Sequence, residues 1–308
     1  MIDMKEVKNV VSTAYQTNLG LMLNGKAEDA FLSTFMKKYT GKIQLILTSP
    51  PFPLNRKKKY GNYKGKAYTN WLAGFAPLFR KLLKRNGSIV IEMGNAWEPG
   101  MPVMSILALE SLITFLKTGS FHLCQQFVYY NPARLPSPAQ WVNVERIRVK
   151  DSFTHIWWMG RCPRPKASNK RVLKEYSPSM EKLLESKKYN HGRRPSEHNI
   201  GRTSFLKHNS GAIPSNVLEF ANTSANDKYQ RYCHERNFPL HPARMPAGVA
   251  EFFIKFLTQP GDLVLDPFAG SNITGAAAQR LNRHWVSIEL KQEYVGGSMG
   301  RFCEKELL

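Results

Sequence analysis

Residues 263–271 are the feature that most narrows what this chain can fold into, because a short apolar run there ends in an acid and then turns through small residues. Residues 263–266 predict a buried strand, and a helical pattern opens at Asn272, directly after the turn. Such a unit places main-chain N–H groups and a helix N-terminus around a ligand, as in dinucleotide sites. The turn lacks the G-x-G-x-x-G phosphate fingerprint and no Walker lysine follows, which favours a nucleoside ligand without phosphates. A purely structural strand–helix turn is the alternative.

Strand-like and helix-like segments alternate on both sides of a long polar region. The expected strands are residues 43–47, 88–92, 121–130, 263–266 and 284–290. The expected helices are residues 72–83, 102–116, 247–257 and 272–281, with Asn86-Gly87 ending the first of them. This alternation predicts an α/β fold, with a mostly parallel, Rossmann-like sheet and helices on both faces.

Residues 161–237 separate the two α/β regions and differ from them in composition. They show weak periodicity and many Arg, Lys, His, Asn, Ser and Gly residues, with one weak helical pattern near 179–185. So long a polar stretch inside a compact protein is expected to be functional or disordered. The sequence therefore predicts that residues 1–160 and 238–308 are two halves of one core and that 161–237 form an inserted region.

The charge balance is strongly basic. Forty-four Lys and Arg against 23 Asp and Glu leave a formal net charge of +21. An excess of that size causes costly self-repulsion unless the partner is a polyanion, so nucleic acid is the favoured partner. A solubilising surface or a ribosome-associated protein is the alternative.

Cysteine spacing and hydropathy argue against several other classes. Cys124, Cys162, Cys233 and Cys303 lie far apart with no C-x-x-C pair, which argues against a zinc module or a disulfide framework. No His/Cys/Asp cluster has metal-ligand spacing, so no metal is expected. No apolar stretch approaches the ~18 residues of a membrane span, and the N-terminus lacks the order of a signal peptide. We expect a soluble, intracellular protein that binds no membrane.

A second motif, Ser49-Pro50-Pro51-Phe52, directly follows the apolar run at 43–47. Each proline fixes its own φ and pushes its predecessor into an extended conformation, so the motif forms a stiff bracket at the carboxyl end of a strand. The bracket offers a hydroxyl, carbonyl groups and one aromatic face. Methylation of an amine conjugated to a heteroaromatic ring needs such groups, since acceptors orient the amine and an aromatic face holds the base out of its stack. An ordinary proline turn is the alternative for this motif alone.

The two motifs are more specific together than either is alone. Each motif follows the carboxyl end of a strand, and both strands are expected in one parallel sheet. Both motifs are therefore expected at the same edge of that sheet, where open α/β sheets bind ligands. The strand after the 263–271 unit ends in Ser287-Ile288-Glu289. Glu289 lies about 18 residues past the second glycine position of the turn, and an acid at that distance and place is the expected partner of ribose hydroxyls.

The order of these motifs resembles the β class of DNA amino-methyltransferases, in which the catalytic motif precedes the target-recognition region and the cofactor motif comes last. Ser49, Pro50, Pro51 and Phe52 are similar to the catalytic motif of the N4-cytosine branch, in which Ser replaces the Asp or Asn of adenine enzymes. Residues 238–246 resemble the segment that contacts the methionyl end of the cofactor, and residues 55–62 and 130–136 resemble segments of this branch. The resemblance implies S-adenosylmethionine as cofactor, S-adenosylhomocysteine as product, and a circularly permuted methyltransferase fold with a target-recognition region at 161–237.

The resemblance also implies a set of cofactor-binding residues. They are Thr48, His241, Pro242, Asp266, Phe268, Ala269, Gly270, Ser271, Glu289 and Glu28. Glu28 is included because the family's Gly-Asp is here Gly25-Lys26, and a lysine cannot replace an acid that contacts the adenine amine. A second departure is Asn272, which stands where the family commonly has glycine.

The expected activity is site-specific transfer of a methyl group to the N4 amine of cytosine in double-stranded DNA. The base is flipped into the pocket and the transfer is direct and in line, without a covalent enzyme intermediate. The alternatives are an N6-adenine enzyme, an enzyme acting on an RNA or protein amine, and a non-catalytic nucleic-acid-binding protein that retains the fold. We also expect the protein to be bacterial or phage-encoded and to act in the cytoplasm. A cognate restriction endonuclease that acts separately is a further expected partner.

Cations follow the bracket directly. A charge run is usually a solvated face, but Arg56, Lys57, Lys58 and Lys59 lie beside the expected base pocket and favour a phosphate clamp. In the middle region, the candidates for contacts to base edges are Arg193, Arg194, His198, Asn199 and Arg202.

The lysine run gives a first prediction. DNA affinity should fall steeply with salt, because bound cations release counterions from phosphates. Neutralising Lys57, Lys58 and Lys59 together should flatten the slope of log affinity against log salt by up to ~0.9 for each phosphate that the variant no longer neutralises. A binding titration across salt concentrations that gives an unchanged slope would show that the run is a solvated face.

Overall fold

The computed structural model describes residues 11–52, 63–220, 227–302 and 304–307. It divides the chain into two compact units. One consists of Met1–Ala167 with Asn216–Leu308, and the other is Ser168–Ser215. The second unit lies within the region 161–237 that the sequence sets apart.

The large unit is built on a nine-stranded sheet with the order β1-β2-β11-β10-β3-β4-β6-β5-β9. The strands in chain order are β1 (Ser12–Gln16), β2 (Gly20–Asn24), β3 (Ile43–Thr48), β4 (Leu83–Met93), β5 (His122–Tyr130), β6 (Phe153–Gly160), β9 (Val217–Glu219), β10 (Leu263–Asp266) and β11 (His284–Glu289). The run from β2 to β4 is parallel, whereas β1 and β6 pair antiparallel with their neighbours. The predicted α/β class with a mostly parallel sheet is confirmed.

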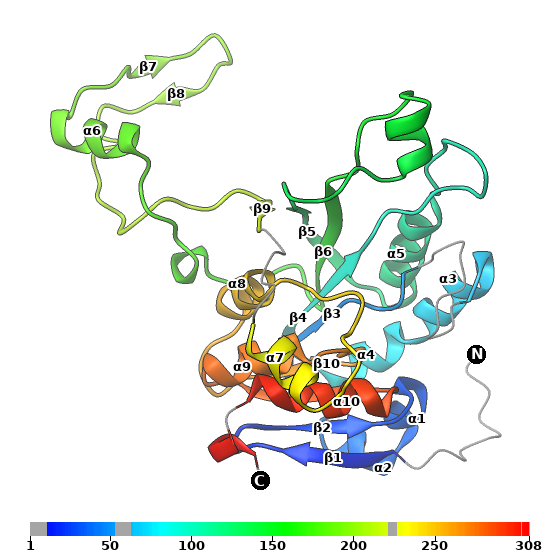
Figure 1. Ribbon diagram of the computed structural model, residues 1–308. Coiled ribbons are helices and arrows are strands. Elements are labelled where there is room, and N and C mark those ends of the chain that lie inside the picture. Colours follow the sequence, from blue (N-terminus) through cyan, green and yellow to red (C-terminus); the bar gives the residue numbers. More distant parts are fainter. Residues whose placement is uncertain (1–10, 53–62, 221–226, 303, 308) are drawn as a thin grey trace. The chain divides into compact units, whose positions relative to one another are not determined.

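Helices cover both faces of this sheet, as predicted (Figure 1). The helices of the large unit are α1 (Ala27–Leu32), α2 (Thr34–Lys37), α3 (Gly65–Gly74), α4 (Ala76–Leu82), α5 (Leu107–Thr118), α7 (Lys228–Glu235), α8 (Ala247–Leu257), α9 (Ile273–Arg280) and α10 (Gln292–Ser298), with short η1 (Gln140–Val144), η3 (Met299–Arg301) and η4 (Glu304–Glu306). One core packs α3, α4 and α5 on the sheet through Phe75, Phe79 and Phe115. The other packs α8 and α9 on the opposite face, with Phe253 and Trp285 fully buried.

Strand β4 corrects one sequence prediction. The helix expected at residues 72–83 ends at Leu82, but Asn86-Gly87, expected to stop it, belong to β4. Pairing with β3 explains this, because Ile43 faces Leu83 while Leu45 faces Ser88, so the residues between them form an irregularity in the strand. The Asn86 carbonyl there accepts hydrogen bonds from the Gln44 side chain and the Lys166 amide, which stabilise it without a helix.

Other boundaries differ where tertiary pairing outweighs local pattern. Helix α5 begins at Leu107, not at residue 102. The β1–β2 hairpin and β6 were not predicted. Strands β1 and β2 have only five residues each, and the burial of all three strands depends on the strands that pair with them. Strands β3 and β10, which position the two motifs, lie where the sequence places them and are adjacent and parallel.

The smaller unit contains η2 (Asn169–Arg171), α6 (Pro178–Ser186) and the hairpin of β7 (Gly192–Arg193) and β8 (Asn199–Ile200). Ser177 caps α6 by accepting a hydrogen bond from the Met180 amide, and Tyr189 packs edge-on against Phe205. No helix in the described ranges of either unit is long and apolar enough to cross a membrane.

Candidate active site

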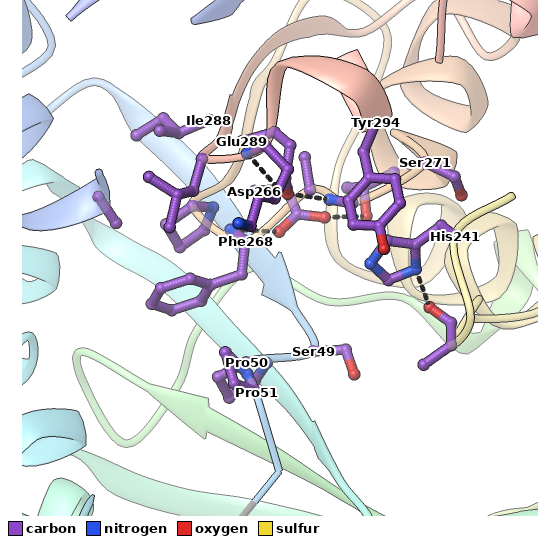
Figure 2. Close-up of a pocket in the computed structure, with 18 of the residues that line it drawn as sticks. Ser49, Pro50, Pro51, His241, Asp266, Phe268, Ser271, Ile288, Glu289 and Tyr294 are labelled. Carbon is purple, nitrogen blue, oxygen red and sulfur yellow. Dashed lines mark hydrogen bonds between the residues drawn. The ribbon is translucent and has the colours of Figure 1, made fainter. Parts of the chain in front are cut away.

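A cavity of about 450 Å³ opens at the carboxyl ends of β3, β10 and β11. Figure 2 shows the bracket that follows β3 facing the turn that follows β10 across this space. The cavity is lined by residues 25–28, 49–52, 63, 68, 71, 241, 243–245, 266–271, 273, 274, 288–291 and 294. The structure therefore brings both sequence motifs to one cavity, as the parallel pairing of β3 with β10 requires.

Asp266 connects the two motifs. Its carboxylate accepts hydrogen bonds from the Thr48 hydroxyl and the Thr274 hydroxyl, both at 2.7 Å, and from the Phe268 amide at 3.1 Å. Thr48 ends β3 and Thr274 lies in the first turn of α9. Burial raises the pKa of Asp266 to about 6, although these hydrogen bonds favour the charged form.

The turn after Asp266 depends on two residues with positive φ. At Gly270 (φ 51°), an added Cβ would lie 2.9 Å from Nε2 of His241, so a side chain there would push into the cavity wall. Asn272 (φ 54°) caps α9 by accepting from the Gly275 amide at 3.2 Å, and it also accepts from the Ser287 hydroxyl at 2.7 Å. Asn tolerates this left-handed conformation, so the departure from the family's glycine is structurally accommodated.

Glu289 ends β11 beside this turn. Its carboxylate accepts from the Gly270 amide and from the Lys291 amide, each at 2.8 Å. Burial raises the pKa of Glu289, and the two amides oppose that shift by stabilising the charged form. Two main-chain donors thus hold an acid at the cavity wall, where its remaining lone pairs can accept from a bound hydroxyl.

An aromatic wall lies beside Glu289. Phe268 packs against Trp71, with ring centroids 5.4 Å apart, and Trp71 in turn contacts Tyr63 and Tyr68. The Trp71 indole N–H donates to a carboxylate oxygen of Glu28 at 2.6 Å, which places Glu28 at the cavity as expected from the sequence. This combination of a flat apolar wall and an acid suits a purine ring with an exocyclic amine. Sequence patterns did not indicate Trp71, because only tertiary packing brings it to Phe268.

Some of the remaining candidate cofactor-binding residues line the cavity and others do not. His241 lines the cavity, its Nδ1–H donates to the Ala243 carbonyl (2.5 Å), and its ring packs edge-on against Tyr294 with ring centroids 4.6 Å apart. Pro242 is exposed and does not line it. Thr48 also does not line the cavity but acts on it through Asp266. Ala269, Gly270 and Ser271 all line it.

The bracket itself is held rigidly. The Tyr68 hydroxyl donates to the Pro51 carbonyl at 2.7 Å. The Phe52 ring lies so close to Gly94, just beyond β4, that an added Cβ there would be 2.4 Å from the ring. Ser49, Pro50, Pro51 and Phe52 all line the cavity.

Glu92 is a functional candidate that the sequence did not indicate. It lies near the carboxyl end of β4, adjacent to β3, and its carboxylate accepts a hydrogen bond from the Ser49 hydroxyl. Burial raises the pKa of Glu92 to about 7, while Ser49 and the charge of Arg134 act to lower it. The signal available in the sequence was a second buried strand ending close to an acid, but its partner could be identified only from the β3–β4 pairing.

The candidates for contacts to base edges all belong to the smaller unit. Arg193, on β7, forms an exposed ion pair with Glu197 at 3.6 Å, and Arg194 donates to the Asn190 carbonyl at 2.9 Å. Arg202 is exposed. Arg56, Lys57, Lys58 and Lys59 lie outside the described residues. Within the parts of the chain that the structure describes, no group of three or more His, Cys, Asp or Glu could hold a metal ion.

Comparison with known proteins gives consistent similarities. Residues 43–299 match the model of a family of N6/N4 methyltransferases described as DNA methylases. The type II methyltransferase M.PvuII of Proteus hauseri is 43% identical over 296 residues, covering 96% of this chain and 87% of that protein. M.BglII of Bacillus subtilis is 24% identical over 262 residues, covering 82% and 61%.

Solved structures agree. The structure of the PvuII DNA methyltransferase, described as cytosine-N4-specific, superposes with a TM-score of 0.76 at 37% identity and covers 95% of this chain and 89% of that one. The structure of a Thermus thermophilus protein complexed with S-adenosyl-L-methionine has a TM-score of 0.55 at 18% identity and covers 92% of this chain and 93% of that one. The second similarity shows a shared fold.

The buried acid Glu92 gives a prediction about stability. Its folded pKa of about 7 exceeds the ordinary value of 4.5, so the folded state binds the proton more tightly. Wild-type stability should therefore contain a contribution that is present below pH 4.5 and is lost as pH rises through 7. Glu92→Gln removes this titration. The difference in the free energy of unfolding, variant minus wild type, should therefore increase from pH 4.5 to about 7 and then level off.

Denaturant titrations at several pH values would measure this difference. Glu219→Gln, at the exposed end of β9, is the matched control for the Glu-to-Gln substitution itself. A Glu92→Gln difference that stays constant with pH would mean that Glu92 titrates normally in the folded protein.

Proposed function

This chain belongs to the N6/N4 DNA methylase family, and from that premise we propose that it methylates the N4 amine of cytosine at a specific site in duplex DNA. The observation that carries the proposal is the position of Ser49, hydrogen-bonded to Glu92 at the end of β3 and directly beside the Asp266 cavity. The identity with M.PvuII over almost the whole chain supports it.

S-adenosylmethionine is the cofactor, and when bound it supplies a methyl group already activated on a sulfonium. The chain has to supply position and electrostatics more than acid–base power. We assign Glu289, held by the amides of Gly270 and Lys291, to the ribose hydroxyls, and the wall of Phe268 and Trp71 to the adenine ring. Asp266 and His241 are assigned to the methionyl end, where a carboxylate favours the ammonium group.

The bracket prepares the amine for attack. The lone pair of an exocyclic amine is delocalised into the base, so acceptors bonded to its two hydrogens orient it and favour the pyramidal geometry of attack. Ser49 has a free lone pair for this role, because its own hydrogen is donated to Glu92. The Pro50 carbonyl is the second acceptor, and Phe52 provides the aromatic face on which the flipped base stacks.

Glu92 gives the departing proton a destination. With a pKa of about 7, its carboxylate can take a proton through Ser49 once the amine nitrogen has been methylated and carries an extra positive charge. The bound cofactor would supply the methyl group for direct displacement by the amine, so the chain would need to form no covalent intermediate.

Serine in the bracket favours cytosine over adenine, because adenine enzymes of this class carry a carboxylate or amide there. The relative described as cytosine-N4-specific supports the same choice. N6-adenine remains the second candidate, since both amines present two hydrogens to the same acceptors.

We further propose that the polar region 161–237 reads the DNA sequence and that residues 56–59 bind phosphates. Arg193, Arg194 and Arg202 would contact base edges. The relatives are type II methyltransferases, which supports a restriction–modification setting with a separately acting endonuclease. A DNA substrate in a bacterial cell supports a cytoplasmic location for the enzyme.

The product identifies the function. Nucleoside digestion of DNA modified by the enzyme should yield N4-methylcytosine and no N6-methyladenine, and single-base sequencing of that DNA would give the target site. Ser49→Ala should bind S-adenosylhomocysteine as wild type does, but transfer the methyl group at least ~10²-fold more slowly, because it removes an acceptor used only at the reacting amine.

Two outcomes would contradict this account at different levels. N6-methyladenine as the main product would overturn the cytosine assignment while retaining the enzyme class. Undiminished transfer by Ser49→Ala would show that the hydroxyl is structural and that the Pro50 carbonyl suffices.

A further inference from the structure

The connection between β5 and β6 exposes large apolar side chains to an unusual degree. Leu135 is 80% exposed, Val144 69%, Ile147 59% and Val149 87%. A single exposed leucine needs no explanation, but several in one short segment mark an interaction site. The segment, bright green beyond the labelled β5 and β6 in Figure 1, projects from the end of the sheet.

The segment leaves the sheet at the edge that carries the active site. Strand β6 is antiparallel to both β4 and β5, so β5 runs in the same direction as β4 and β3. The carboxyl end of β5, at Tyr130, therefore lies on the same sheet edge as Ser49. Leu135 follows that end by only a few residues.

Leu135 is presented on a braced turn. The Asn131 side chain accepts from the Ala133 amide at 3.0 Å, and the Asn131 carbonyl accepts from the Arg134 amide at 3.2 Å. Lys150 donates to the carbonyls of Pro132 and Arg134, both at 3.3 Å. Leu135 is therefore exposed on a supported backbone between Arg134 and Pro136, where holding an apolar side chain in water brings no benefit to the folded chain alone.

The charge around Leu135 suits a polyanion. Arg146, Arg148 and Lys150 accompany Arg134 in the segment, against the acids Glu145 and Asp151. Arg148 also fixes the segment to the neighbouring loop, because it donates to the Pro102 carbonyl at 2.9 Å and lies 4.5 Å from the Trp97 ring centroid. An exposed apolar side chain with the cations Arg134 and Lys150 beside it is an arrangement with which proteins insert a wedge between base steps.

We propose that Leu135 is the wedge that enters the DNA duplex where the target base has left it. The proposal rests on the proposed function, because a base that is to be methylated has to leave the stack and its departure costs unstacking and unpairing energy. A leucine inserted at the gap replaces part of the stacking that the base has given up, while the cations of the segment contact the flanking phosphates. The occupant of this surface is thus duplex DNA at the flipped site.

Rescue by a weakened base pair tests the wedge. Single-turnover methylation would be measured on a duplex with the target cytosine paired to guanine, and on one with an abasic nucleotide opposite that cytosine. Leu135→Ala should slow transfer about tenfold on the paired duplex and less than about threefold on the abasic one, where little pairing has to be broken. Leu135→Met should transfer at the wild-type rate on both, because methionine also serves as a wedge.

Leu123→Ala is the matched control, since Leu123 is an exposed leucine (45%) at the opposite end of β5. Equal slowing of Leu135→Ala on both duplexes, or a rate no lower than that of Leu123→Ala, would overturn the wedge while wild-type methylation upholds the proposed function. A change in oligomeric state on sedimentation, with unchanged rates, would overturn it in favour of a protein interface. Failure of the wild type to methylate DNA would overturn both proposals.

Discussion

The hydrogen bond between Thr48 and Asp266 is the interaction on which the site depends, because it joins the ends of two adjacent parallel strands that carry different motifs. On one side of it lies the bracket that begins at Ser49, and on the other the turn that opens α9. Parallel pairing brings both strand ends to one edge, and the 2.7 Å contact fixes how the two loops diverge from it. The cofactor's methyl group and the amine that receives it can therefore meet only if this sheet edge keeps its geometry.

Acids gather at this edge at a cost to the folded state. Asp266 and Glu92 are buried and Glu289 is half-buried, and burial raises the pKa of each. Hydroxyls and main-chain amides from neighbouring loops compensate in part, and each compensation also positions a group: Glu289 holds the Gly270 turn, and Glu92 orients the Ser49 hydroxyl. The same hydrogen bonds thus stabilise the buried carboxylates and position the groups around them. Enzyme sites commonly tolerate the unfavourable burial of charged groups in this way.

Local pattern predicted the elements that hold the motifs but not the contacts between them. Residues 247–257 and 263–266 coincide with α8 and β10, because strong apolar runs there end at clear breakers. Asn86-Gly87 misled as a helix stop, since pairing with β3 decides the start of β4. Glu92 and Trp71 belong to the site only through strand pairing and ring packing between residues distant in sequence. The sequence placed Glu92 at the end of an expected strand but could not show that it pairs with Ser49, and it carried no signal for Trp71. Asn272 departed from the family pattern, yet its side chain caps α9 in the required left-handed conformation.

Replacing Thr48 by valine is the most direct test of this dependence, because it deletes one hydroxyl in a buried position and keeps the shape of the side chain. The account predicts that Thr48→Val weakens S-adenosylhomocysteine binding, measured by calorimetry, by roughly tenfold, since Asp266 is left without one of its buried partners. Methyl transfer at saturating cofactor should also slow, since the bracket loses its connection to β10. Thr114→Val on α5 is the control and should change neither. Wild-type affinity and rate in Thr48→Val would contradict the claim that this hydrogen bond couples the two motifs.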